Sequence, residues 1–143
     1  MQIGYGLSYS LTMKAAPPAG VTRTHTYETT LEMRASQLQA DIFSTPAMIG
    51  LMERTCVDLT ASYLDPDEQT VGIHVDVRHR APTKIGQSVT VTATVLEVHE
   101  NKILYSISAT NDHGVKIGDG THRRAVINTK RFGNNALFEE RRS

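Results

Sequence analysis

Apolar residues in this chain form one helical block followed by several alternating blocks, and this order predicts the fold. The run from Ala47 to Leu64 is apolar around most of a helical circumference, which is typical of a buried helix. Thr45 is a residue type that caps helices, and Pro46 suits the first helical position, so we expect the helix to begin there. Asp65-Pro66-Asp67 should end it.

After this helix the sequence follows the two-residue period of β-strands. Valine and isoleucine occupy every second position from Val71 to Val77, and β-branched residues dominate residues 88–98. Short polar turns then lead into two further strands, over residues 103–111 and 115–128. A buried helix followed by strands joined through hairpins predicts an α+β fold, in which an antiparallel sheet wraps around a central helix.

The chain before the helix has weaker patterns. Residues 6–13 alternate loosely, which predicts a first strand that ends before Pro17-Pro18. Residues 21–42 are polar and mixed, so we expect loop and short helix around the site. At 143 residues the chain is long enough for a substantial core, and we expect a single domain over residues 1–143.

Composition narrows the classes of function. Lys plus Arg and Asp plus Glu both total 15, so no net positive charge favours nucleic acid as a partner. The single cysteine excludes an intramolecular disulfide and suits a cytoplasmic protein. No apolar run approaches the ~20 residues of a membrane span, and the N-terminus lacks a signal-peptide pattern. The six histidines show no metal-ligand spacing, so we expect neither a metal nor another cofactor.

Glu53 is the first candidate for chemistry. Its neighbours three and four residues away on the helix are Ile49, Gly50, Cys56 and Val57, and none of them can form an ion pair with it. A carboxylate in this setting needs a partner elsewhere or has a raised pKa. Both a catalytic acid and a buried structural salt bridge fit this pattern.

His79 and Thr45 are the other two candidates. His79 shares the strand face of Val77 and should point towards the helix, either as a hydrogen-bonded core residue or as a proton-transfer group. Thr45 is explained by helix capping, but a hydroxyl at a helix N-terminus also lies where negative charge is stabilised. Glu53 follows about two turns later, so the two groups can flank one pocket. We expect Cys56 to be a small core residue and His74 to lie on the surface.

Three stretches of the chain carry a family resemblance: FSTPAMIGLMERTC at 43–56, VGIHVDVRHRAPTKIGQSVTVTATV at 71–95 and IGDGTHRRAVI at 117–127. With Arg131-Phe132, they resemble the hotdog-fold thioesterases of the fluoroacetyl-CoA thioesterase type. The resemblance implies a single hotdog domain that hydrolyses an acyl-CoA thioester, with CoA present only as part of the substrate. It also implies a homodimer with sites at the interface, which can associate further.

The resemblance assigns roles to individual positions. The family's catalytic set matches Thr45, Glu53 and His79, and its substrate-binding positions match Gly72 and Arg124. Ser36 and Gln39 replace the phenylalanines that close the pocket of the fluoroacetyl-specific enzyme. We therefore expect hydrolysis of a small or medium acyl-CoA without fluoroacetyl specificity.

Several alternatives remain at this level. Thr45 can attack the thioester while His79 and Glu53 move protons, or Glu53 can attack or activate water while Thr45 orients the substrate. A non-catalytic acyl-CoA-binding hotdog protein would share the pocket, and dehydratases share the fold. A hydratase is the weaker alternative because the short-spaced aspartate and histidine pair of that family is missing.

Overall fold

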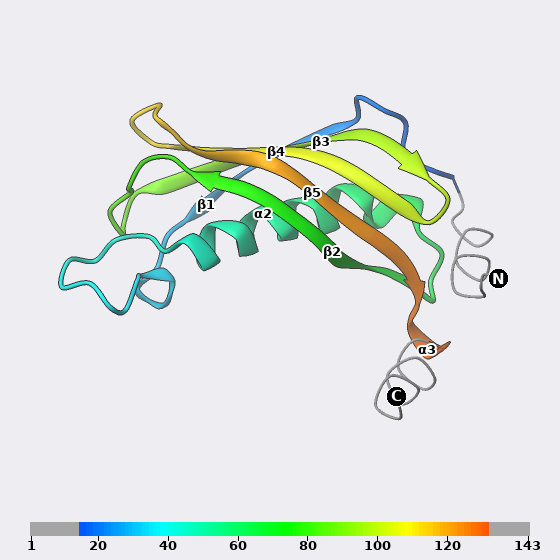
Figure 1. The fold of residues 1–143 in the computed structure, drawn as a ribbon, viewed down its shortest axis with the longest axis horizontal. Coiled ribbons are helices and arrows are strands. Elements are labelled where there is room, and N and C mark those ends of the chain that lie inside the picture. Colours follow the sequence, from blue (N-terminus) through cyan, green and yellow to red (C-terminus); the bar gives the residue numbers. More distant parts are fainter. Residues whose placement is uncertain (1–14, 132–143) are drawn as a thin grey trace.

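The computed structural model describes residues 15–131, in which an antiparallel sheet curls around one long helix (Figure 1). The helix is α2 (Thr45–Thr60). The sheet has five strands in the order β1-β3-β4-β5-β2. Their bounds are β1 (Thr22–Glu28), β2 (Glu68–His79), β3 (Ser88–His99), β4 (Lys102–Asn111) and β5 (Lys116–Asn128). Three short segments complete the described chain: η1 (Leu31–Met33), η2 (Ala61–Tyr63) and α3 (Thr129–Arg131).

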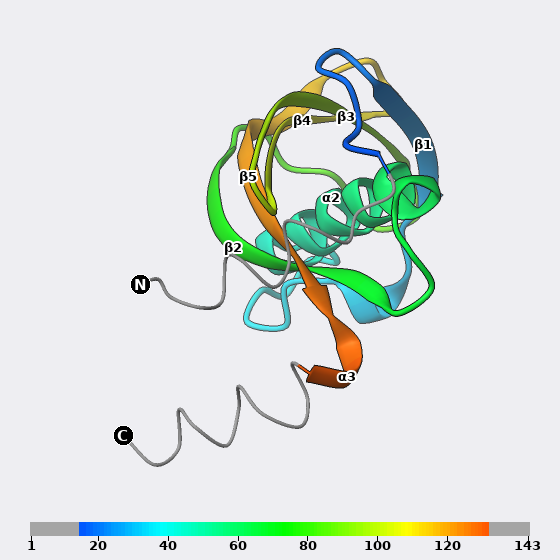
Figure 2. The same cartoon turned by 90° about the vertical axis from the view of Figure 1, so that its right-hand side faces the viewer.

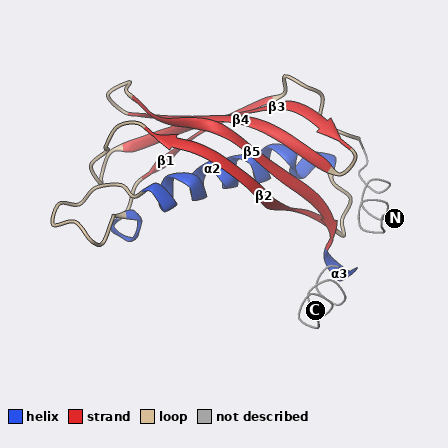
Figure 3. Cartoon of the chain, viewed as in Figure 1, coloured by secondary structure: helices blue, strands red, loops and turns tan. Residues whose placement is uncertain are grey.

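The predicted α+β architecture is confirmed. Turning the molecule by 90° shows the strands arching around α2 (Figure 2). Within the described chain α2 is the one long helix, and the remaining helical segments are short (Figure 3). Met48, Met52 and Cys56 on α2 are fully buried against the sheet, where Val91 and Ile103 are also fully buried. Within residues 15–131, no helix has the length and apolar character needed to cross a membrane.

The ends of α2 differ from the prediction. Ser44, rather than Thr45, is the N-cap, and its hydroxyl oxygen accepts a hydrogen bond of 3.2 Å from the N–H of Ala47. Thr45 is therefore the first helical residue, and its hydroxyl is not needed for capping. The α-helix ends at Thr60 and continues as the 3₁₀ turn η2, instead of running to Leu64.

Strand β1 lies in a region where we expected loop and short helix. The short helix exists as η1, but residues 22–28 form an edge strand in which Tyr27 alone is buried. Its threonines pair instead with threonines of β3, at Oγ1–Oγ1 distances of 2.6, 3.0 and 2.8 Å (Thr22–Thr94, Thr24–Thr92, Thr26–Thr90). Hydroxyl pairs across strands stabilise this strand without an apolar alternation. The strand predicted over residues 6–13 falls outside the described residues.

An irregularity in β2 changes the predicted strand face. The pairing of β2 with β5 shifts between Gly72 and His74, so Ile73 is an extra residue, as in a β-bulge. Gly72 and His79 would lie on opposite faces of a regular strand, yet both approach α2. The prediction that one apolar face runs unbroken to His79 is therefore wrong, and Ile73 and Val75 are 46% and 42% exposed.

Candidate active site

The start of α2 and the end of β2 meet at a hydroxyl–imidazole pair. The Thr45 hydroxyl oxygen lies 2.6 Å from Nδ1 of His79, the last residue of β2. Ser44 caps the helix, so the exposed Thr45 hydroxyl is free to make this contact. This pair confirms that His79 points towards the helix, and it places a nucleophilic group next to a base.

The environment of His79 favours its neutral form. Burial lowers the pKa of His79 from its usual 6.5, because the imidazolium loses hydration. Its Nε2 atom is buried and has no hydrogen-bond partner within residues 15–131. A neutral imidazole with its proton on Nε2 leaves Nδ1 as an acceptor for the Thr45 hydroxyl proton.

A cavity of about 640 Å³ opens beside this pair. Thr45 and His79 both line it, together with Ser44 and Pro46 at the helix start. Residues 34–38 and residues 80–82 also line it, so the loop before α2 forms part of the cavity wall. The volume lies in the range of small-molecule pockets. Ser36 lines the cavity, whereas Gln39 is not part of the lining.

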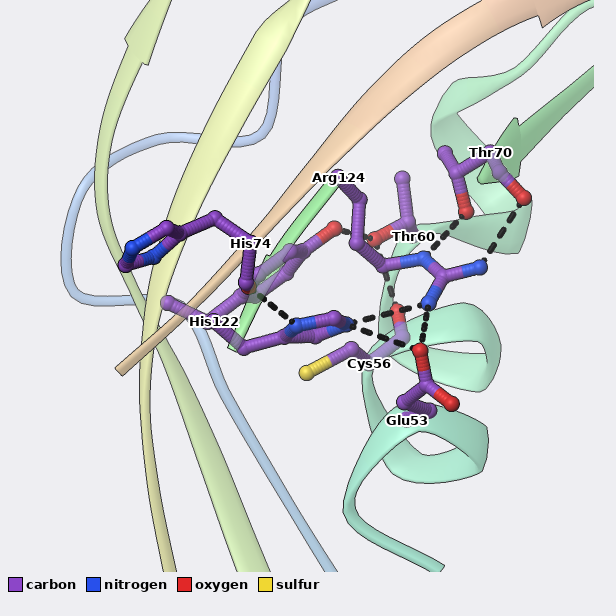
Figure 4. Close-up of polar contacts among 8 residues, drawn as sticks. Glu53, Cys56, Thr60, Thr70, His74, His122 and Arg124 are labelled. Carbon is purple, nitrogen blue, oxygen red and sulfur yellow. Dashed lines mark hydrogen bonds and ion pairs between the residues drawn. The ribbon is translucent and has the colours of Figure 1, made fainter. Parts of the chain in front are cut away.

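Glu53, in contrast, belongs to a second polar cluster two turns further along α2 (Figure 4). Its Oε2 atom lies 3.4 Å from Nη1 of Arg124 and 3.6 Å from Nε2 of His122. Arg124 also donates through Nε to the Thr70 hydroxyl at 2.8 Å and through Nη2 to the Thr70 carbonyl at 2.9 Å. The cluster therefore joins α2, β2 and β5 around a guanidinium group whose side chain is only 7% exposed.

Gly72 gives the cluster the space that a side chain at this position would take from Glu53. A Cβ atom at Gly72 would lie 2.6 Å from Oε2 of Glu53, 3.1 Å from Cε1 of His122 and 3.4 Å from Nη1 of Arg124. The first distance is far below a normal van der Waals contact. The two positions implied as substrate-binding, Gly72 and Arg124, therefore both adjoin Glu53.

The structure brings the five predicted residues together as two groups. Thr45 pairs with His79, and Glu53 gathers with Gly72 and Arg124. Within the described part of the chain, no hydrogen bond or ion pair connects Glu53 with Thr45 or His79. Eight residues along a helix correspond to about 12 Å, which is too far for one small reacting group to touch both. A single copy of the chain thus holds the predicted catalytic set in two halves.

Sequence reasoning missed His122 and Thr70. His122 is fully buried and Thr70 is 7% exposed, and both contact Arg124. The available signal was the GTHRR stretch, in which His122 stands two residues before Arg124 and therefore on the same strand face. Residues 15–131 contain no group of three or more His, Cys, Asp or Glu side chains arranged to hold a metal ion.

Cys56 lies next to this cluster but is chemically inert. Its side chain is fully buried, and the loss of hydration raises the pKa of its thiol to about 12. The Tyr105 hydroxyl, buried against Thr60 at 2.5 Å, also has its pKa raised to about 12 by burial. Neither group ionises near neutral pH, so the prediction that Cys56 is a small core residue is confirmed.

Comparison with known proteins gives consistent results. Residues 21–130 match the family model described as fluoroacetyl-CoA-specific thioesterase, FlK. A fluoroacetyl-CoA thioesterase from Streptantibioticus cattleyicolor is 42% identical over 92 residues, which span 64% of this chain and 66% of that protein, just under two thirds of its length.

Solved structures agree in fold. A structure of the fluoroacetyl-CoA thioesterase FlK is 32% identical, with a TM-score of 0.79 over 88% of this chain and 98% of that one. A variant of FlK in complex with acetyl-CoA is 30% identical, with a TM-score of 0.81 over 86% of this chain and 98% of the other. A hot-dog-like protein from Thermanaerovibrio acidaminovorans is 25% identical, with a TM-score of 0.77 over 85% and 92% of the two chains.

Proposed function

The chain belongs to the fluoroacetyl-CoA-specific thioesterase family, and from this premise we propose that it hydrolyses a small or medium acyl-CoA to the free acid and CoA. The observation that carries the proposal is the Thr45–His79 pair, with its oxygen–nitrogen distance of 2.6 Å, at the wall of a cavity of about 640 Å³. A hydroxyl hydrogen-bonded to a neutral imidazole is a nucleophile with its base in place.

The geometry favours Thr45 as the attacking group. The Thr45 oxygen bonds to the thioester carbonyl carbon, and its proton passes to Nδ1 of His79. The carbon–sulfur bond then breaks, and the CoA thiolate takes the proton from His79. Water next attacks the acyl-threonine ester with His79 as the base, which releases the acid and restores the threonine. Acylation and deacylation each protonate the imidazole once and then return it to its neutral form.

The helix start offers one backbone donor for the developing oxyanion. Pro46 has no N–H, and the N–H groups of Ala47 and Met48 already bond to Ser44. Within the described chain this leaves the N–H of Thr45 unused. We therefore propose Thr45 N–H as the oxyanion donor, reinforced by the positive end of the helix dipole.

We infer that Glu53 reaches this pair from a second copy of the chain. The distance of about 12 Å along α2 separates it from Thr45 of its own chain. We propose a homodimer in which each copy brings its Glu53 cluster to the Thr45–His79 pair of the other. Glu53 then orients the water that attacks the acyl group, while His79 takes the proton of that water. Higher association of dimers is compatible with this arrangement.

Strand β2 provides the surface for such a dimer. It lies at the edge of the sheet formed by the described strands, so one side of its backbone has no strand partner within residues 15–131. Ile73 and Val75 on it are 46% and 42% exposed, which is unusual for large apolar side chains on an isolated edge. Pairing of β2 with β2 of a second copy would satisfy the backbone and cover both side chains.

The pocket wall supports a substrate other than fluoroacetyl-CoA. Residues 34–38 contribute Arg34, Ser36 and Gln37 as well as Ala35 and Leu38 to the cavity lining, and none of them is aromatic. Ser36 occupies a position where the fluoroacetyl-specific enzyme is expected to have a phenylalanine. Without that aromatic ring the pocket holds more water and loses selection for one very small acyl group. We propose activity on several short and medium acyl groups.

The test is release of free thiol from a panel of acetyl-, fluoroacetyl-, butyryl-, octanoyl- and benzoyl-CoA. The wild type should release CoA from several of them, and Glu53→Gln should lose at least about a hundredfold in turnover. Asp58→Asn, the same chemical change at an exposed position of α2, is the matched control and should retain activity. No release from folded protein that still binds acyl-CoA would instead indicate a binding protein.

A further inference from the structure

We propose that His122 is a positioning residue, a neutral hydrogen-bond acceptor that holds Arg124 so that one guanidinium N–H faces Glu53. The inference rests on the proposed part of Glu53 in thioester hydrolysis. It adds a residue that touches neither substrate nor reacting atoms, and it defines which nitrogen of His122 carries the proton.

The contacts of His122 determine its tautomer. Its Nε2 atom lies 3.0 Å from Nη1 of Arg124. A guanidinium group only donates hydrogen bonds, so Nε2 must be the acceptor and carries no proton. The proton is therefore on Nδ1, which lies 2.9 Å from the carbonyl oxygen of His74 and donates to it. That carbonyl lies at the irregularity of β2, so the extra residue Ile73 contributes indirectly to the tautomer.

The same assignment changes the meaning of the short distance between Glu53 and His122. Oε2 of Glu53 lies 3.6 Å from Nε2 of His122, which would be an ion pair if the imidazole were protonated. With a lone pair on Nε2, the two atoms are both acceptors. Nη1 of Arg124 lies 3.0 Å from one and 3.4 Å from the other and can donate one hydrogen to each. Arg124 therefore joins His122 and Glu53.

Arg124 cannot rotate freely in this arrangement. Its Nε and Nη2 groups are held by the hydroxyl and the carbonyl of Thr70. His122 supplies the third fixed contact, on the side that faces Glu53 (Figure 4). A planar guanidinium held by these three contacts presents the second hydrogen of Nη1 in one direction, which aligns the carboxylate of Glu53.

His122 itself is firmly placed. Its side chain is fully buried, and its ring stacks with Tyr105 of β4 at a centroid separation of 6.2 Å and an interplanar angle of 27°. Gly72 leaves room for the imidazole and for Glu53 together, since a Cβ atom there would press on both. Strand pairing also sets Tyr105 directly opposite His122, so the backbone fixes the stack.

Protonation of His122 would dismantle this alignment. The ionisable or charged groups around the imidazole are Arg124 on β5, Glu53 and Cys56 on α2, Tyr105 on β4 and the His74 side chain on β2. Burial lowers the pKa of His122, and the charge of Arg124 acts in the same direction. A proton on Nε2 would remove the acceptor for Arg124 and place two cations side by side.

Two substitutions separate the functions of the two ring nitrogens. His122→Asn retains a donor near the Nδ1 position for the His74 carbonyl but removes the acceptor for Arg124. His122→Gln retains an acceptor near the Nε2 position. We expect His122→Asn to lower kcat by about 10- to 100-fold with KM nearly unchanged, and His122→Gln to recover a large part of that loss. His113→Asn, in the exposed turn between β4 and β5, is the control.

Equal loss in both variants, accompanied by equal loss of thermal stability, would show a purely structural residue and overturn the proposal. Nitrogen-15 NMR of the wild type gives an independent answer even if the variants fold poorly. The proposal requires a protonated Nδ1 and an unprotonated Nε2 on His122 at pH 7, and the opposite tautomer would overturn it. Absence of thioester turnover in the wild type would instead refute the proposed function, while the nitrogen signals would still decide the Arg124 contact.

Discussion

The hydroxyl of Thr45 lies 2.6 Å from Nδ1 of His79, and this contact exists because a different residue caps the helix. The Ser44 hydroxyl accepts a hydrogen bond from the N–H of Ala47, so the hydroxyl of Thr45, the first helical residue, remains available for His79. The separation of the two tasks between neighbouring residues makes each one measurable without disturbing the other.

Substitutions at Ser44 and Thr45 should therefore affect different properties, stability at Ser44 and turnover at Thr45. Thr45→Ala should abolish most thioester turnover, by about 10²-fold or more, with little change in thermal stability. Ser44→Ala should cost about 1 kcal/mol of stability through loss of the cap, with turnover reduced much less. Thermal melts and CoA release on the same preparations test this. A Thr45→Ala protein with full turnover would exclude Thr45 as the nucleophile.

Replacement of Gly72 should impair the site more than the fold. In Gly72→Ala the new methyl group would collide with Oε2 of Glu53, which is the end of a flexible side chain and can move aside. We expect a cooperative fold and a loss of kcat of about tenfold or more, because Glu53 is displaced. Gly50→Ala, on α2 with open space around it, is the control. It should keep its turnover and gain about 0.5–1 kcal/mol in the free energy of unfolding.

Acidification should reduce stability through two histidines, the fully buried His122 and the partly buried His79. Burial lowers the pKa of both His79 and His122 below the usual 6.5, so below that pH the unfolded chain binds more protons than the folded one. The stabilising contribution is present above about pH 6.5 and is lost as the pH falls through the lowered values.

Urea unfolding at pH 7.5 and pH 5 measures this loss, and His79→Gln/His122→Gln should show a smaller pH dependence than the wild type. Asp119 contributes in a separate, more acidic range, because its hydrogen bond with Arg80 lowers a pKa whose usual value is 3.8. An unchanged pH dependence in the double variant would contradict the assignment to the histidines.

Charge introduced at the edge of the sheet should disrupt both assembly and activity. Ile73→Asp places a carboxylate on the exposed apolar part of β2, which we propose to be the dimer contact. Sedimentation should show a shift towards monomer, and turnover should fall in parallel, because in the proposed dimer each site takes its Glu53 from the other copy. Val115→Asp, at a similarly exposed valine near the β4–β5 turn, is the control. A fully active monomer would contradict the shared site.

The sequence predicted the parts of the fold that follow a strong hydrophobic period. The buried helix and strands β2 to β5 fall into this class, because their core faces alternate clearly or cover most of a helix. Strand β1 lacks such a period, because hydrogen-bonded threonine pairs between β1 and β3 replace apolar contacts along most of the strand. The interruption at Ile73 was also invisible, because a single extra residue leaves no compositional mark.

The family resemblance predicted which residues matter better than the residue pattern predicted how they meet. Thr45 and His79 form a pair and line the same cavity, as residues of one catalytic set should. The separation of Glu53 from that pair follows from the rise of an α-helix, and it is the reason why we propose a contribution from a second chain. His122 escaped notice because a buried histidine beside an arginine has no distinctive spacing, and its role depends on a carbonyl displaced by the strand irregularity.

The burial of Cys56 has a practical consequence for enzymology. The chain contains a single cysteine, and its thiol is fully buried with a pKa of about 12. Thiol-reactive dyes attack the thiolate, which this cysteine scarcely forms at the pH of an assay. The native protein should therefore not react with such dyes. The colour that develops in a continuous assay then measures the released CoA alone. Dye uptake by the protein would in turn signal its unfolding, so one reagent can monitor both product and structural integrity.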